Sequence, residues 1–339
     1  MQNNTNKQPF EVLPAVKPAH FEKGIQDVII CWGDSITQSK PGYSYPSQLE
    51  ENLGGQYQVY NAGAAGETSI AIMSRANVAE VFLQYDIRFS ENCEFSNVFN
   101  RGVKDEAHPV SASKYTECWL VDKNGNNVYY TANGNLLPIT KVVIGGTAFE
   151  LIEVKNGKTN VWGHYEKFKL KRKGDITDAL TLTAGSRVTF DYSEKFTNAY
   201  CAVVLFGAND FWFDDKTPNA EERLNMLINR YKAVRNTAEN ALYIIPYFWP
   251  ADITDAFVKA FGRDADKLIN IREYFREQAF TDYGLSPTEE DLVWINKNCV
   301  PPCFWASTDK GPDCHLNHLG YKIIADVIYK HGIKLGFWK

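Results

Sequence analysis

The chain has 339 residues, a formal net charge of −5 and 23% charged residues. A chain of this length can bury a full core, in one large domain or in two ordinary ones. It has no basic run and no stretch approaching the roughly 20 apolar residues of a membrane helix, so we expect neither nucleic-acid binding nor a transmembrane segment.

Residues 1–24 are predicted to form an irregular arm, because Pro9, Pro14 and Pro18 are spaced through them. The segment Met1–Lys7 is polar and lacks the apolar core of a signal peptide. We therefore expect no signal peptide in this chain and a soluble protein, with its cellular location left open.

An apolar strand at 27–32 is followed by Gly-Asp-Ser-Ile-Thr at 33–37. In open α/β sheets, ligands bind at the edge formed by the carboxyl ends of the strands. Ser35 is therefore expected at the mouth of a cleft, beside a turn whose backbone N–H groups can face an oxyanion.

A helix is predicted at 44–53 and a short strand near 57–60. The loop after that strand contains Gly63 and Gly66, which permit a tight turn from a strand into a helix. The apolar spacing beyond the loop predicts a second helix at about 69–84.

The sequence pattern changes between about 87 and 196, where short alternating segments are separated by turn signals. Asn-Gly pairs occur at 124–125, 133–134 and 156–157. Strand-like runs at 141–144 and 148–154 lie among them, and Asn-Gly between alternating runs is a strong hairpin signal. We predict an antiparallel β domain of about 110 residues, inserted at 87–196.

The α/β pattern resumes with a strand at 200–206, followed by Gly-Ala-Asn-Asp at 207–210. The remaining expected elements are a helix at 219–238, a strand at 241–245, helices near 252–262 and 264–279, a loop-rich stretch at 280–312 and a last helix at about 317–331. Alternating strands and helices predict a mostly parallel sheet that is covered on both faces.

A final segment, His-Leu-Asn-His-Leu-Gly-Tyr at 315–321, opens the last helix. The four segments, in this order, resemble those of the SGNH hydrolases, also called the GDSL esterase/lipase family, which is named for a Ser, a Gly, an Asn and a His in separate blocks. The resemblance covers about 25–85 and 197–335. It implies a three-layer α/β/α, flavodoxin-like hydrolase domain made of 25–86 and 197–339, with 87–196 as an insertion that we interpret as a candidate carbohydrate-binding unit.

The resemblance also implies site residues. Ser35 would be the nucleophile, and its backbone N–H, the backbone N–H of Gly66 and the side-chain amide of Asn209 would form the oxyanion hole. His315 is preferred over His318 as the base, because the family block has His, one residue, Asn, two residues, Gly and an aromatic residue. Gly63 is expected to serve the turn instead.

The acid of the triad departs from the family pattern, which has Asp three residues before the His. Pro312 occupies that place, Asp313 lies two residues before His315, and Asp309 lies six before it. Asp313 is our candidate for the carboxylate that orients the imidazole. The alternative is a Ser–His dyad in which a backbone carbonyl orients the ring.

No metal or organic cofactor is required by this mechanism. Cys31 and Cys201 lie in strands and are expected to be reduced core residues. Cys299, Cys303 and Cys314 have poor spacing for zinc, so we expect one disulfide or ordinary burial there.

We therefore expect a serine ester hydrolase acting on a small-molecule or glycan ester, with removal of O-acetyl groups from a carbohydrate as the favoured activity. That preference rests on the β insertion and on the content of 14% aromatic residues, with eight Trp. The alternatives are a short-chain lipase or thioesterase, and a glycan-binding module on the same fold with weak catalysis. The sequence does not predict an oligomeric state.

Overall fold

The computed structural model describes most of the chain outside residues 1–24. The described residues are 25–39, 43–99, 119–123, 128, 141–153, 167–173, 177–190, 199–210, 220–234, 238–248, 253–307 and 314–339. The expected arm at 1–24 and the three Asn-Gly pairs lie outside them.

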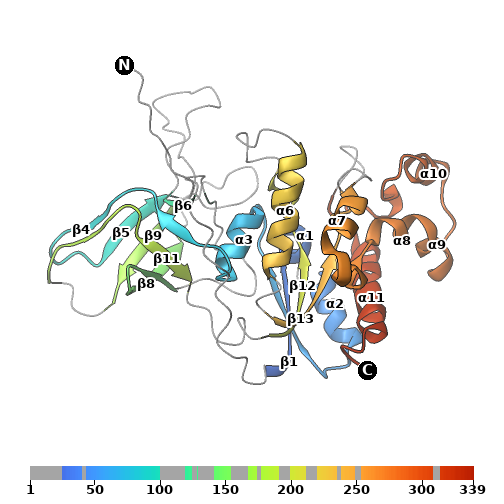
Figure 1. Cartoon of the computed structure of the whole chain (residues 1–339), viewed down its shortest axis with the longest axis horizontal. Coiled ribbons are helices and arrows are strands. Elements are labelled where there is room, and N and C mark those ends of the chain that lie inside the picture. Colours follow the sequence, from blue (N-terminus) through green and yellow to red (C-terminus); the bar gives the residue numbers. More distant parts are fainter. Residues whose placement is uncertain are drawn as a thin grey trace, which may run out of the picture.

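A parallel sheet of five strands forms the centre of the molecule (Figure 1). Its strands, in spatial order, are β2 (Gln58–Gly63), β1 (Ile25–Gly33), β12 (Ala199–Leu205), β13 (Ala238–Ile244) and β14 (Leu268–Ile269). Counted along the chain within this sheet, the order is 2-1-3-4-5, the flavodoxin-like order. The strand order reverses between β1 and β12, so this fold favours a ligand site at the carboxyl ends of those two strands.

Strand β1 is buried on both of its faces. Val28, Ile30 and Trp32 pack into one hydrophobic cluster, and Ile29 and Cys31 pack into another on the opposite face. A nearly continuous apolar run is what a central parallel strand requires, because helices cover both of its sides.

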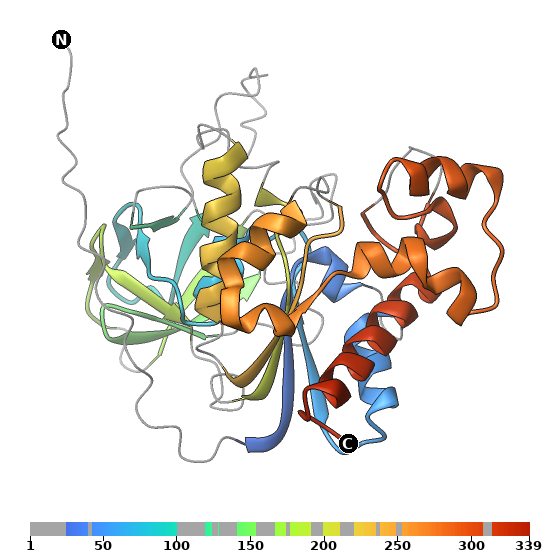
Figure 2. The ribbon, with the colours of Figure 1, turned by 45° about the vertical axis from the view of Figure 1, so that its right-hand side comes forward.

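Helices cover both faces of this sheet (Figures 1 and 2). One face carries α2 (Tyr45–Asn52), α8 (Ile271–Glu277) and α11 (His318–Lys334), and the other carries α3 (Ser69–Arg75), α6 (Ala220–Val234) and α7 (Ile253–Phe261). The predicted α/β class with a parallel sheet covered on both faces is therefore confirmed. No helix among the described residues combines the length and the apolar character needed to cross a bilayer.

A second, antiparallel sheet of seven strands lies to one side of the first (Figure 1). Its strands, in spatial order, are β5 (Phe95–Phe99), β9 (Lys167–Arg172), β8 (Thr147–Glu153), β7 (Lys141–Ile144), β11 (Arg187–Phe190), β3 (Val81–Leu83) and β6 (Leu120–Asp122). The short strands β4 (Ile87–Phe89) and β10 (Leu180–Leu182) pair separately. The expected antiparallel strands are present, whereas a separate inserted domain with the bounds 87–196 stays a prediction.

The hairpin between β7 and β8 turns at two glycines that the sequence analysis did not single out. Gly145 and Gly146 have φ of 55° and 88°, and Ile144 pairs with Thr147 across them. A two-residue hairpin turn of this kind needs positive φ at both positions, which glycine adopts at little cost.

The prediction of a helix at 69–84 is wrong in length, because the helix is shorter. Helix α3 ends at Arg75, Ala76 caps it, and Asn77 adopts a left-handed φ of 53°. The chain then extends into β3, which pairs with β6 and β11. Asparagine tolerates the left-handed conformation that ends a helix, and the apolar residues that follow are buried in a strand.

Helix α3 contributes to two hydrophobic clusters at once. Ala71 belongs to the cluster beneath the antiparallel sheet, whereas Ile72 and Met73 belong to a cluster against the parallel sheet. The seven residues of α3 therefore connect the two sheets through packing.

The C-terminal third differs from the expectation in two places. The helix expected at 264–279 is instead a 3₁₀ turn at Gly262–Lys267, strand β14 and then α8, whose start is capped by the Asn270 side chain. The stretch expected to be loop-rich also contains α9 (Ala279–Asp282) and α10 (Glu289–Asn296). A capping box formed by Thr288 and Asp291 starts α10, and this local signal was missed.

Candidate active site

Ser35 and His315 meet at the carboxyl end of β1. Ser35 is the first residue of the short helix α1 (Ser35–Gln38), and His315 lies in the segment leading into α11. The Nε2 atom of His315 is 2.9 Å from the Oγ atom of Ser35, although the two residues are 280 positions apart in the chain. An imidazole at this distance can accept the proton of the hydroxyl.

Asp34 directly precedes Ser35 in the chain and joins two loops. Its Oδ1 accepts from the Ile36 N–H at 3.0 Å, and its Oδ2 accepts from the Ala208 N–H at 3.2 Å. The side chain is fully buried, and this burial raises the pKa of Asp34 to about 6, opposed by the two amide hydrogen bonds and by nearby His315. The carboxylate thereby fixes the loop after β12 relative to the turn that carries Ser35.

Two glycines allow α1 to pack closely on the strand ends. A Cβ atom at Gly33 would lie 1.9 Å from the Oγ1 atom of Thr37, and one at Gly63 would lie 2.1 Å from the backbone N of Gln38. Neither distance is compatible with a side chain. Gly63 thus serves close backbone approach, which is a more specific reason than the turn that its position predicted.

The three expected oxyanion donors come from neighbouring loops. Gly66 has a φ of 79°, which favours glycine, and the Nδ2 atom of Asn209 donates to the carbonyl of Glu67 at 2.9 Å. Within the described part of the chain, the structure gives no acceptor to the backbone N–H of Ser35 or of Gly66. The Asn209 amide carries two hydrogens, so its bond to Glu67 uses only one of them.

A buried ion pair supports the Gly66 loop. The Nε atom of Arg75 lies 2.6 Å from the Oε2 atom of Glu67, and both side chains are almost completely buried. The same guanidinium donates from Nη2 to the carbonyl of Ala62 at 2.9 Å. Helix α3 therefore holds both ends of the loop that contains Gly66, a contact that the sequence analysis did not predict.

A second ion pair, buried at its carboxylate and half-buried at its arginine, supports the Asn209 loop. Asp210 accepts from the backbone N–H of Ser69 at 3.0 Å and also from the Ser69 hydroxyl. The Nη1 atom of Arg230, on α6, lies 2.9 Å from the Oδ1 atom of Asp210 and 2.7 Å from the Oγ atom of Ser69. The Gly-Ala-Asn-Asp motif could have pointed to Asp210, but nothing in the sequence pairs it with Arg230.

Hydrogen bonds to its backbone carbonyls hold the His315 segment in place. The Tyr247 hydroxyl, just beyond β13, donates to the carbonyl of Cys314 at 2.6 Å, and the Ala306 N–H donates to the carbonyl of His315 at 2.9 Å. Asn317 caps α11 by accepting from the N–H of Gly320 at 3.0 Å.

The two candidate acids and the second histidine of the last motif remain to be placed. Asp313 and Asp309 lie outside the described residues. The Sγ atom of Cys314 is 3.7 Å from the Nδ1 atom of His315. His318 packs edge-on against the Tyr43 ring at a centroid distance of 5.0 Å, so of the two histidines it is His315 that the structure brings to Ser35.

The expectations for the cysteines are confirmed for two residues and wrong for three. Cys31 and Cys201 are free and buried, as predicted, and burial raises the pKa of both thiols well above the ordinary value. Cys299, Cys303 and Cys314 also form no disulfide, but none of them is buried, so the expectation of a disulfide or burial there is wrong. Cys299 lies in a turn before the 3₁₀ helix Pro302–Phe304, Cys303 lies within that helix, and Cys314 directly precedes His315, and none of the three is enclosed by packing. Across the described residues, no group of three or more His, Cys, Asp or Glu side chains could hold a metal ion.

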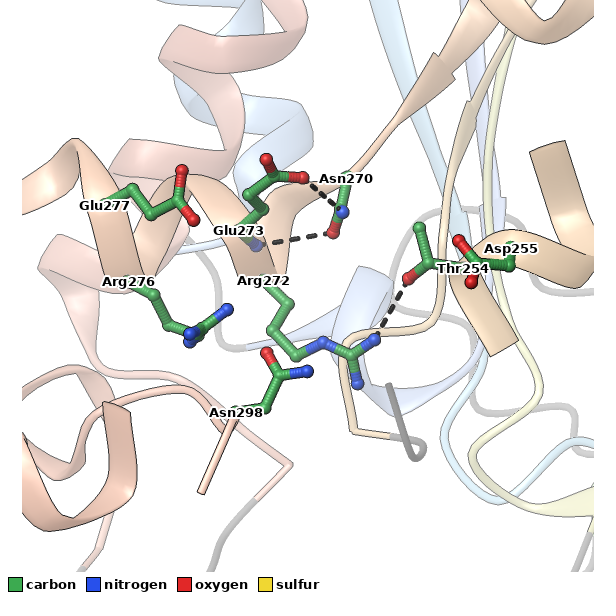
Figure 3. Close-up of a pocket in the computed structure, with 8 residues that line it drawn as sticks. All are labelled: Thr254, Asp255, Asn270, Arg272, Glu273, Arg276, Glu277 and Asn298. Atoms are coloured by element: carbon green, nitrogen blue, oxygen red, sulfur yellow. Dashed lines mark hydrogen bonds between the residues drawn. The ribbon is translucent and has the colours of Figure 1, made fainter. Parts of the chain in front are cut away.

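A polar cavity of about 190 Å³ lies elsewhere on the same edge of the sheet (Figure 3). Asn270, directly after β14, and Arg272 and Arg276, on α8, are among its lining residues. Arg272 is nearly buried and donates to the Oγ1 atom of Thr254 at 3.0 Å. Neither Ser35 nor any expected oxyanion donor lines this cavity, so we do not assign it to the candidate site.

Comparisons with known proteins leave the family open. No family model matches the chain, and no curated protein matches it. Among solved structures, it is similar to one titled "Peptidoglycan O-acetylesterase in action, 5 min", with a TM-score of 0.34 and 10% sequence identity over 92% of each chain. A similarity at this level carries no argument about fold or activity.

Proposed function

We propose that the protein is a serine ester hydrolase in which Ser35 is the nucleophile and His315 is the general base. The observation that carries this proposal is the 2.9 Å contact between the Ser35 hydroxyl and the His315 Nε2 atom at the switch point of the parallel sheet. A serine hydroxyl is a weak nucleophile until a neighbouring base removes its proton, and this contact supplies the base.

In the first step, His315 takes the Ser35 proton while Oγ attacks the ester carbonyl. The tetrahedral intermediate collapses as the imidazolium returns the proton to the leaving alcohol, which leaves an acyl group on Ser35. Water then attacks the acyl group with His315 again as base, and the acid and free Ser35 are released.

The oxyanion would be stabilised by three donors from separate loops: the N–H of Ser35, the N–H of Gly66 and the second N–H of the Asn209 amide. Support comes from the hydrogen bond between Asn209 and Glu67, which ties the Asn209 loop to the Gly66 loop at 2.9 Å. Donors fixed in advance act where charge develops in the transition state, and loss of one typically lowers the rate about 10²–10³-fold.

Asp313 is proposed to orient His315, with a Ser–His dyad as the alternative. An orienting carboxylate holds the imidazole in the tautomer that accepts at Nε2. Asp313→Asn should therefore lower kcat markedly in a triad and leave it nearly unchanged in a dyad. The measurement is the kcat of this variant beside that of His315→Ala.

We favour O-acetylated carbohydrate as the substrate. Besides the aromatic content of the chain, the antiparallel sheet presents the Phe95 ring, which is 38% exposed. The Nζ atoms of Lys169 and Lys171, on the neighbouring strand, lie 5.4 and 5.9 Å from the centroid of this ring. An exposed aromatic ring of this kind can stack on a sugar.

Hydrolysis of p-nitrophenyl acetate and butyrate tests the proposal. We expect the wild-type protein to cleave the acetate, Ser35→Ala and His315→Ala to lose that activity, and the rate to fall steeply from acetate to butyrate. Retained butyrate activity would favour a short-chain lipase or thioesterase. A wild-type rate no higher than that of Ser35→Ala would contradict the esterase and favour a glycan-binding module.

A further inference from the structure

We infer that Arg230 is a positioning residue for the oxyanion hole, acting through Asp210 on the Asn209 amide. This inference rests on the proposed function. Arg230 lies on α6, a helix that carries none of the four motif segments. Its Nη1 atom contacts the Oδ1 atom of Asp210 at 2.9 Å and the Oγ atom of Ser69 at 2.7 Å.

The two contacts of Arg230 join the two loops that must deliver the oxyanion donors. Asp210 directly follows Asn209, and Ser69 lies two residues beyond Glu67, the residue whose carbonyl accepts from the Asn209 amide. Asn209 is therefore fixed on its backbone side through Asp210 and on its side-chain side through Glu67. Arg230 contacts both Asp210 and Ser69, and so links the two loops a second time.

The burial of the Asp210 carboxylate explains why the positive charge of Arg230 matters there. The Asp210 side chain is 6% exposed and that of Arg230 is 12% exposed, and among the described residues Arg230 is the cation paired with Asp210. A buried carboxylate that loses its cation either takes up a proton or draws in water. Both changes would weaken its bonds to the Ser69 N–H and hydroxyl, which set the spacing between the Gly66 and Asn209 loops.

The kinetic signature follows from where the donor acts. An oxyanion donor contributes mainly in the transition state, so its displacement lowers kcat and leaves KM nearly unchanged. We expect Arg230→Met to lower kcat by about 10- to 100-fold, less than the loss of a donor itself, because the amide is displaced and not removed.

A double-mutant cycle with Asn209→Ala tests whether Arg230 acts through Asn209. If it does, Arg230→Met should lower kcat strongly in the wild-type background and by less than threefold in the Asn209→Ala background. An equal fall in both backgrounds, or no fall in the wild-type background, would overturn the inference.

Three controls separate positioning from folding. Arg230→Lys keeps the positive charge and should recover part of kcat. Arg187→Met removes a largely exposed arginine, paired with Glu80 at 3.3 Å, and should behave as wild type. Titration of Ser35 with a phosphonate counts the active molecules, so that kcat is expressed per reactive serine even if Arg230→Met is partly unfolded.

A readout without catalysis keeps the inference separate from the proposed function. The side-chain NH₂ resonance of Asn209, assigned by its absence in Asn209→Ala, should shift in Arg230→Met and stay in place in Arg187→Met. If the wild-type protein hydrolyses no ester, the proposed function fails while this spectrum still tests the contact. If the wild type is active but neither kcat nor the resonance responds to Arg230→Met, the inference alone fails.

Discussion

Asp34 is the single residue in which folding and the candidate chemistry are most closely connected. Its two oxygens accept from the Ile36 and Ala208 amides, and the side chain is completely buried and interacts electrostatically with His315. Burial favours the neutral carboxyl, whereas the amide donors favour the carboxylate. Burial is the larger effect, and it raises the pKa of Asp34 to about 6.

The raised pKa predicts how stability depends on pH. Between about pH 4 and 6 the folded protein retains a proton on Asp34 that the unfolded chain has released, so rising pH favours unfolding. This residue should lower the free energy of unfolding by about 2 kcal/mol between pH 4 and 7. Urea unfolding of the wild type and of Asp34→Asn across this range measures it.

The Asn side chain does not titrate, so the difference between the two proteins should change with pH in favour of the variant. A constant difference from pH 4 to 7 would contradict the raised pKa.

Gly63 predicts a steric effect at one position. Gly63→Ala places a methyl group 2.1 Å from the Gln38 nitrogen, and that backbone belongs to the turn that starts at Ser35. We expect a loss of about 1–3 kcal/mol in the free energy of unfolding and a lower esterase kcat. Gly54→Ala is the matched control, because its Cβ would meet open space at a φ of 60°, so it should lower stability without lowering kcat.

Among single residues, the sequence predicted the motif residues of the candidate site better than the charged residues that support their loops. The motif spacing placed Ser35 and His315 in segments that do meet. The partners Arg75 and Arg230 were missed, because each is an ordinary charged residue of a helix until the fold brings a carboxylate to it. Local patterns carry no signal for such pairs.

Among the elements, α3 shows why helix length is hard to predict from apolar spacing. Val81 continued the apolar pattern of the helix, but it belongs to β3, where burial in the antiparallel sheet gives the same apolar requirement. Only the left-handed Asn77 marks the change, and an isolated asparagine is a weak signal.

The buried pair between Glu67 and Arg75 predicts strong coupling between α3 and the loop before it. Arg75→Met alone would leave a buried carboxylate without its cation and should lower the free energy of unfolding by about 3–5 kcal/mol. The double variant Arg75→Met with Glu67→Leu removes both charges and should be more stable than Arg75→Met. Urea unfolding of the wild type, of Arg75→Met, of Glu67→Leu and of the double variant checks this, and additive losses would contradict a direct pair.

For the whole molecule, the alternation of strands and helices was sufficient to predict the parallel sheet, because consecutive βα units leave few arrangements. The antiparallel strands followed from alternating runs and turn signals. The start of that region was not predictable, because β3 lies before residue 87 and is an internal strand of the antiparallel sheet.

The position of β3 predicts which fragment can fold. A fragment of residues 87–196 lacks β3, which pairs on one side with β6 and on the other with β11. We expect 79–196 to show a cooperative unfolding transition by circular dichroism and 87–196 to show none. Equal cooperativity of the two fragments would mean that β3 is dispensable.

Helix α3 has a consequence for communication between the two sheets. Its Ala71 face packs beneath the antiparallel sheet, its Ile72 face packs on the parallel sheet, and its first residue, Ser69, contacts Asp210. Local opening of either sheet must therefore disturb the same seven residues. If a ligand binds the antiparallel sheet, hydrogen exchange at the α3 amides should slow, and exchange in the Gly66 loop should slow with it. Binding at one sheet would then alter the loop beside Ser35, the proposed nucleophile, at the other.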